Sequence, residues 1–162
     1  LARGLEMTAG DLETGRHMAD LFRGLMQPGF IPAVIFVIAA LVTVASGFSW
    51  SSMALIMPIA VQMALPAGET VLFGAVAATI SGAICGAQMI PYSDKSVMTA
   101  AACGITPLYH VKTQSPQIFL TSLTALGGFL ALGAGAPLAL VIPGGFLALL
   151  ALHFFFARPF SS

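Results

Sequence analysis

The sequence has 162 residues, of which 58% are hydrophobic and only 7% are charged, and its formal net charge at pH 7 is zero. Soluble domains carry about 25% charged residues, so this composition excludes an ordinary water-soluble fold and indicates an integral membrane protein. No basic run is present, so nothing supports a nucleic-acid partner. Cys85 and Cys103 lie in apolar surroundings without a metal-binding spacing, so we interpret them as packing residues and expect no cofactor.

Residues 1–29 are predicted to form an amphipathic interfacial helix and a loop. Apolar side chains recur at helical spacing between Asp11 and Met26, with charged side chains opposite, which is the pattern of a helix lying along a membrane surface. The chain starts at Leu1 without an initiator Met, and its mixed-charge beginning is typical of a loop inside a longer protein. We therefore expect an upstream N-terminal half, since transporters are often built from two halves, and we also consider a homodimer.

Residues 30–157 are predicted to form an all-α, polytopic transmembrane helix bundle. The apolar stretch 30–46 is followed by a polar break around Trp50 and by a second apolar run, residues 53–65. A span needs about 20 apolar residues, so the second run is short. Either the first stretch crosses the membrane with the tryptophan at the interface, or residues 30–65 form a re-entrant hairpin. We favour the hairpin or a broken helix, because non-helical backbone at membrane depth is tolerated where it lines a cavity.

The next apolar segment, Val71 to Ile90, has about the length of a span and is rich in Gly and Ala. Small residues let helix backbones approach closely, so we expect this helix in the interior of the bundle. Pro91 interrupts the segment, and Ser96 to Gly104 is predicted to be a short half-helix. Two further spans are expected, at residues 119–132 and 138–156.

Charge is concentrated in one stretch of the chain, Ser81 to Pro116. It contains three of the four formally charged residues found between Gly24 and Ala157, which are Glu69, Asp94, Lys95 and Lys112. Charge in a bilayer is costly and is usually kept only where it faces a cavity or a partner. Two interrupted apolar segments predict a binding site near the membrane midplane, because broken helices free carbonyls for a cation and direct helix N-termini at an anion.

Asp94 is the natural ligand in this stretch for a transported cation or a proton. Lys95 would neutralise the carboxylate when no ion is bound. The alternative is that both residues form a solvated turn between two helices, and the pattern alone leaves the two interpretations open. Further oxygen ligands would come from the hydroxyls of Ser46, Ser49, Ser93, Ser96 and Thr99.

Two blocks of sequence resemble the NhaC-type Na+/H+ antiporters. The segment ASGFSWSSMALIMPIA, residues 45–60, is similar to one motif of that family. SGAICGAQMIPYSDKSVMTAA, residues 81–101, and the following HVKTQSP, residues 110–116, are similar to a second, in the same order and at similar spacing. The resemblance covers roughly residues 34–120. It implies a polytopic inner-membrane protein that exchanges Na+ for H+, some members coupling organic acids, of which this chain would be the C-terminal half.

Carried over by position, the resemblance implies a site at both breaks and in the polar string that follows. Its residues are Ser46, Gly47, Ser49, Trp50, Pro91, Ser93, Asp94, His110, Lys112, Thr113 and Gln114, next to which we place Lys95 and Ser96.

Several positions depart from the family's pattern. The family has acidic residues where this chain has Ala87, Thr106 and Tyr109, a Ser-Pro where it has Ile90-Pro91, and a threonine where it has Lys95. Fewer carboxylates and an added ammonium weaken a site for bare Na+, since a hard cation prefers oxygen ligands. Lys95 would then replace the cation electrostatically or contact an anionic substrate.

Three other functions compete with cation/proton antiport. An organic-anion carrier of the dicarboxylate or lactate type would bind a carboxylate through Lys95 and helix N-termini. An intramembrane serine protease would use Ser49 with His110 or His153 as base, although nothing else in the sequence supports an enzyme. An accessory or incomplete membrane half would not transport alone. We expect the antiporter, with no catalytic residue.

Overall fold

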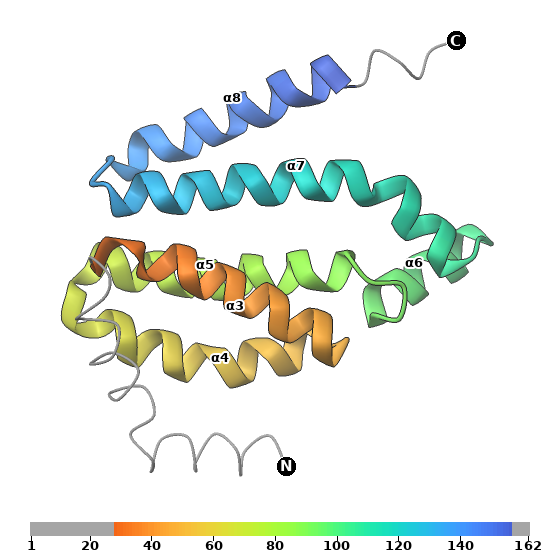
Figure 1. Cartoon of the computed structure of the whole chain (residues 1–162), viewed down its shortest axis with the longest axis horizontal. Helices are drawn as coiled ribbons and strands as arrows, with labels where there is room; N and C mark the ends of the chain where they lie inside the picture. Colours follow the sequence, from red (N-terminus) through yellow and green to blue (C-terminus); the bar gives the residue numbers. More distant parts are fainter. Residues whose placement is uncertain (1–27, 157–162) are drawn as a thin grey trace.

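The computed structural model describes residues 28–156, which form six α-helices and two 3₁₀ helices (Figure 1). The all-α prediction is thus confirmed for this part of the chain. The amphipathic helix predicted between Asp11 and Met26 lies outside the described residues. The elements are η1 (Pro28–Phe30), α3 (Ile31–Ser46), α4 (Ser49–Ala64), η2 (Leu65–Ala67), α5 (Glu69–Gln88), α6 (Asp94–Cys103), α7 (Pro107–Gly133) and α8 (Leu138–Phe156).

Within residues 28–156, three helical stretches are long and apolar enough to cross a membrane. They are Ser49–Ala67, Glu69–Gln88 and Pro107–Gly133, whereas the apolar helices at Ile31–Ser46 and Leu138–Leu152 are shorter. A multi-pass architecture is therefore supported by the length and the composition of the helices.

Two of the predicted membrane spans begin earlier than expected, because polar residues form the first turns of their helices. The run predicted at 53–65 begins at Ser49, after an extended Phe48, and with η2 it reaches Ala67, which gives 19 residues. The span predicted at 119–132 begins at Pro107, so the polar string is part of α7. Serine near a helix start and proline at its first position are both favourable, since the first N–H groups have no partner within the helix.

The centre of the fold is the contact between α3 and α5. A Cβ atom on Gly82 would collide with the carbonyl oxygen of Phe36, and one on Gly86 would collide with that of Ala40. The two backbones therefore touch directly, as small residues allow in membrane helices. α4 packs against both helices, so the predicted interior position of α5 is confirmed.

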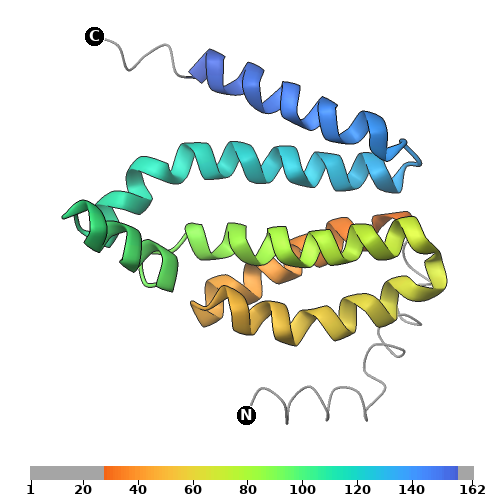
Figure 2. The same ribbon diagram turned by 180° about the vertical axis from the view of Figure 1, so that it is seen from behind.

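The remaining helices lie beside this three-helix unit. α7 contacts α3 and α5, and the rings of Phe36 and Phe129 lie 5.6 Å apart between α3 and α7. α8 packs on α7, on the side away from α3, as both ribbon views show (Figure 2). α7 changes direction near its N-terminal end in Figure 1, and Pro116 within this helix removes one backbone hydrogen bond.

Two connections between helices lie at the same end of the molecule (Figure 1). The α3–α4 connection is Gly47-Phe48, and the α5–α6 connection is residues 89–93. Gly47 has φ +80°, which favours glycine, and its N–H donates to the carbonyl of Thr43 at 2.8 Å to end α3. The chain from 30 to 65 is thus two helices joined by a two-residue turn, while its depth in a membrane stays a prediction.

Candidate functional site

Hydroxyl groups surround the α3–α4 connection. The Oγ atoms of Ser46 and Ser52 lie 2.9 Å apart, and Ser52 also donates to the carbonyl of Phe48 at 3.0 Å. Ser49, in the first turn of α4, is fully buried, and its Oγ has no hydrogen-bond partner among the described residues. An unpaired buried hydroxyl costs about 1–3 kcal/mol, so Ser49 Oγ is a candidate to contact a water or an ion.

The α5–α6 connection ends at a capped helix start. Ser93 accepts a hydrogen bond from the backbone N–H of Ser96 at 3.2 Å, and its own hydroxyl donates to Ser96 Oγ at 3.0 Å. Both serines are buried. The half-helix predicted to begin at Ser96 therefore begins at Asp94, because the capping residue is Ser93.

Asp94 and Lys95 consequently occupy the first turn of α6 and not a turn between helices. Both are half-buried, and Asp94 Oδ1 accepts a hydrogen bond from the backbone N–H of Lys95 at 2.9 Å. A carboxylate in the first turn interacts favourably with the positive end of the helix dipole. The same position leaves carboxylate oxygen available at the end of the molecule where the two connections meet.

Tyr92 joins the two connections. Its hydroxyl donates to the carbonyl oxygen of Val44 at 2.6 Å, across 48 positions of sequence. Its ring covers Gly47, where an added Cβ would lie 3.3 Å from a ring carbon. The two breaks singled out in the sequence are therefore in direct contact through the residue next to Ser93.

The other predicted site residues differ in their location and exposure. Gln114, on α7, donates from Nε2 to Oε1 of Gln88 at 3.1 Å, and so reaches the last residue of α5. Thr113 is exposed, and its hydroxyl donates to the carbonyl of His110, one turn earlier on α7, at 2.9 Å. Trp50, in the first turn of α4, is 74% exposed.

Three residues that sequence reasoning passed over have structural roles at this end. They are Ser52, Gln88 and Tyr92, which hold the connections through hydrogen bonds from one helix to another segment. Gln88 carried a signal, since it is the one amide in a mostly apolar helix. The partner of Tyr92 had none, because a backbone carbonyl is not visible in a sequence.

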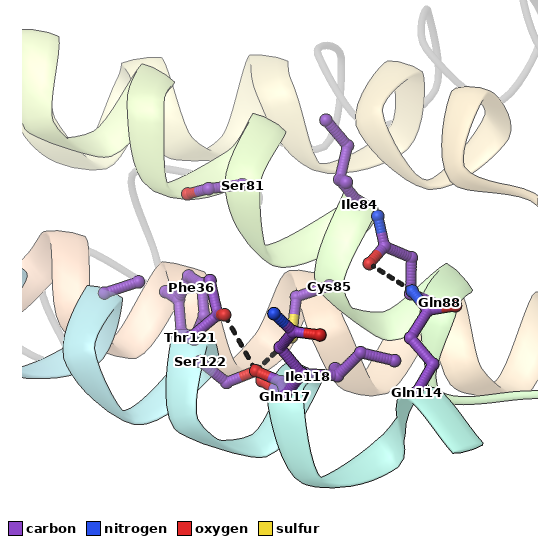
Figure 3. Close-up of a pocket in the computed structure, with 11 residues that line it drawn as sticks. Phe36, Ser81, Ile84, Cys85, Gln88, Gln114, Gln117, Ile118, Thr121 and Ser122 are labelled. Carbon is purple, nitrogen blue, oxygen red and sulfur yellow. Dashed lines mark hydrogen bonds between the residues drawn. The ribbon is translucent and has the colours of Figure 1, made fainter. Parts of the chain in front are cut away.

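A groove of about 450 Å³ lies between α5 and α7, with Phe36 of α3 at one side (Figure 3). Gln114 is the one predicted site residue that lines it. The groove is therefore distinct from the two connections. Its nearest point to them is Gln88, the last residue of α5, which is hydrogen-bonded to Gln114.

The two connections and the helix turns next to them carry serine hydroxyls, backbone carbonyls and one carboxylate, that of Asp94. Within residues 28–156, no three His, Cys, Asp or Glu side chains are grouped so that they could hold a metal ion.

Residues 1–134 match the family model described as the Na+/H+ antiporter family. Among curated proteins, one from Haemophilus influenzae, described as an uncharacterized protein, is 29% identical over 124 residues. That match covers 76% of this chain and 24% of the relative, so the chain spans about a quarter of the relative's length. No solved structure matches.

Proposed function

The chain belongs to the Na+/H+ antiporter family, and we propose that it supplies the cation-binding part of a cation/proton antiporter. The resemblance noted in the sequence is thereby confirmed at the level of the family. The protein is a multi-pass membrane protein of a transporter family and not an enzyme. The observation that carries the proposal is the contact, through Tyr92, between the two connections beside Asp94.

In this proposal Asp94 binds either the cation or the proton, one at a time. Because a single carboxylate carries both, loading with one releases the other, and this mutual exclusion couples the two fluxes. The unpaired hydroxyl of Ser49 is a further oxygen ligand, together with carbonyls in the last turns of α3 and α5, which lack partners within their helices. Lys95 compensates the charge of the empty site.

We place the site toward one face of the membrane and not at the midplane expected from the sequence. α5 has 20 residues, which at 1.5 Å per residue gives about 30 Å, close to the thickness of the hydrocarbon core. Glu69 at its start is exposed, as suits an interface, so the connection that follows Gln88 lies near the opposite interface.

A second candidate is an organic-anion carrier, favoured by one observation. Lys95 is half-buried in the first turn of α6, where an ammonium and the helix N-terminus would both attract a carboxylate. In this alternative Asp94 orients Lys95 and does not bind the cargo.

The decisive experiment uses the full-length protein in liposomes that hold a pH-sensitive dye. Imposed Na+, Li+ or K+ gradients should drive proton flux in wild type, and Asp94→Asn should abolish it, because an amide cannot exchange a proton for a cation. Glu69→Gln is the matched control, since it removes the exposed carboxylate at the other end of α5. This variant should transport at the wild-type rate. Wild type without cation-driven flux, but with uptake of a labelled carboxylate that Lys95→Thr abolishes, would favour the anion carrier.

A further inference from the structure

The end of the molecule that carries the two connections also carries the single tryptophan and both tyrosines of the chain. Trp50 lies in the first turn of α4, Tyr92 in the α5–α6 connection and Tyr109 in the first turn of α7. These three segments lie at the same end of the ribbon in both views (Figure 1, Figure 2). The three side chains are 74%, 59% and 59% exposed, so separate segments present aromatic rings to the surroundings.

This end also presents three hydrogen-bond donors that have no partner in the described part of the chain. Among residues 28–156, the indole N–H of Trp50, the hydroxyl of Tyr109 and the ammonium of Lys112 make no hydrogen bond or ion pair. All three residues are exposed. In hydrocarbon these donors would stay unsatisfied at a high cost in free energy, because acyl chains offer no acceptor. This end of the molecule therefore does not lie among the acyl chains.

The same end is too apolar for bulk water. The helix α6 has 10 residues, or about 15 Å, and is too short to cross a membrane. Its buried side chains are Ser96 and Ala100, while Val97 and Met98 are 45% and 73% exposed. An exposed apolar face beside amphipathic rings is typical of the membrane–water interface, where tryptophan and tyrosine are enriched.

The length of α7 indicates the same depth. Its 27 residues correspond to about 40 Å, whereas the hydrocarbon core is about 30 Å thick, so roughly two turns extend beyond the core. The C-terminal part of α7, up to Gly133, is apolar and suits hydrocarbon. The projecting turns are therefore the first ones, Pro107 to Thr113, which contain Tyr109 and Lys112.

We propose that this end of the molecule is a lipid-anchoring surface, in which Trp50, Tyr109 and Lys112 bind the headgroups of phospholipids. The phosphate and ester oxygens of a headgroup are acceptors, which complements three unpartnered donors, one of them cationic. The rings and the exposed face of α6 contact the outermost part of the acyl chains. This surface binds lipid whichever ion the protein carries, and it keeps the two connections at a fixed depth.

The first test uses Trp50 as a fluorescent reporter in the full-length protein, after any other tryptophan has been replaced by phenylalanine. In vesicles of phosphatidylcholine and phosphatidylglycerol, a nitroxide near the headgroup should quench Trp50 at least about twofold more than a nitroxide near the end of the acyl chain, because the indole lies at headgroup level. Leu123→Trp combined with Trp50→Phe is the matched control. Leu123 is 57% exposed in the apolar part of α7, so the deeper nitroxide should quench its replacement more.

Three outcomes of this test would overturn the lipid-anchoring surface. Stronger quenching of Trp50 by the deeper nitroxide would place this end in hydrocarbon. Quenching by aqueous iodide alone would place it in bulk water. Protection from both the lipid and the aqueous quenchers would show that another part of the protein, or a second copy, covers Trp50.

The second test addresses Lys112, which lies three residues after Tyr109 and so on the same face of α7. In Tyr109→Trp combined with Trp50→Phe, spin-labelled phosphatidylglycerol should quench the new indole about twofold more than spin-labelled phosphatidylcholine, because the ammonium attracts the anionic lipid. Lys112→Gln should remove this difference and Lys112→Arg should keep it. Equal quenching by the two lipids while Lys112 is present would overturn its assignment to the surface. Neither test measures transport, so a failure here leaves the antiporter untouched, and a failure of the antiporter leaves the surface standing.

Discussion

At the level of single residues, the hydroxyl of Tyr92 links the end of α3 to the α5–α6 connection. The last four carbonyls of a helix have no partner within it, and the carbonyl of Val44 is one of these in α3. Tyr92 donates to it at 2.6 Å while its ring packs over Gly47. The residue thus fixes the end of α3 relative to the segment that carries Ser93 and Asp94, which is the geometry that the proposed site requires.

Removing this one hydroxyl gives a sharp prediction. Tyr92→Phe keeps the ring and should lower the free energy of unfolding by about 1 kcal/mol, since the carbonyl of Val44 loses its donor. Tyr92→Ala also removes the ring and should cost more. Tyr109→Phe is the control, because Tyr109 is also exposed and its hydroxyl makes no such bridge among the described residues. Thermal unfolding in detergent measures these effects, and equal midpoints for the Tyr92→Phe variant and wild type would contradict the bridge.

At the scale of helices, the contact of α3 with α5 depends on the absence of side chains. Gly86→Val should prevent the two backbones from meeting, since even a Cβ atom there would collide with the carbonyl of Ala40. We expect a strong loss of monodisperse protein in size-exclusion chromatography. Gly127→Val on α7 is the matched control, because a Cβ there would meet no atom within 4 Å. Equal yields of the two variants would show that the contact does not hold these helices together.

The sequence predicted best those helices whose ends coincide with a change in hydropathy. The last helix runs from Leu138 to Phe156 as expected, and α5 is displaced by two residues at each end. The predicted helix starts were wrong for α4, α6 and α7, which begin at Ser49, Asp94 and Pro107 with polar first turns. Hydropathy does not distinguish a polar first turn from a loop, although the serine cap at the start of α6 is a local signal.

The candidate site was predictable only as a list of residue types. Asp94 stands out in the sequence because charge is scarce, and hydroxyls near each break follow from composition. That the two breaks touch depends on α3 and α5 running side by side, which no local pattern specifies. The bonds from Tyr92 to Val44 and from Gln114 to Gln88 are products of this packing, as is the burial of Ser49.

At the scale of the whole molecule, the alignment of the helix ends determines how close the proposed site lies to one membrane interface. Pro32 lies against Gly74 near the start of α5, and both α3 and α5 end at the two connections. From Glu69 to Gln88 is about 30 Å along the helix, so the two ends of α5 face opposite interfaces. In the proposed function, the site at the two connections would therefore exchange ions with water mainly on one side of the membrane.

This placement is tested by labelling the full-length protein with a membrane-impermeant thiol reagent in vesicles of both orientations. Cys103, exposed at the end of α6, should react from one side, and Glu69→Cys in a background with Cys103→Ala should react from the other. Cys85 is half-buried in the groove and should react slowly from either side, which makes it the control for leaky vesicles. Reaction of both positions from the same side would contradict a full crossing by α5. If Cys103 resisted the reagent from both sides while Glu69→Cys reacted, the connections would lie at depth, and the site would belong at the midplane.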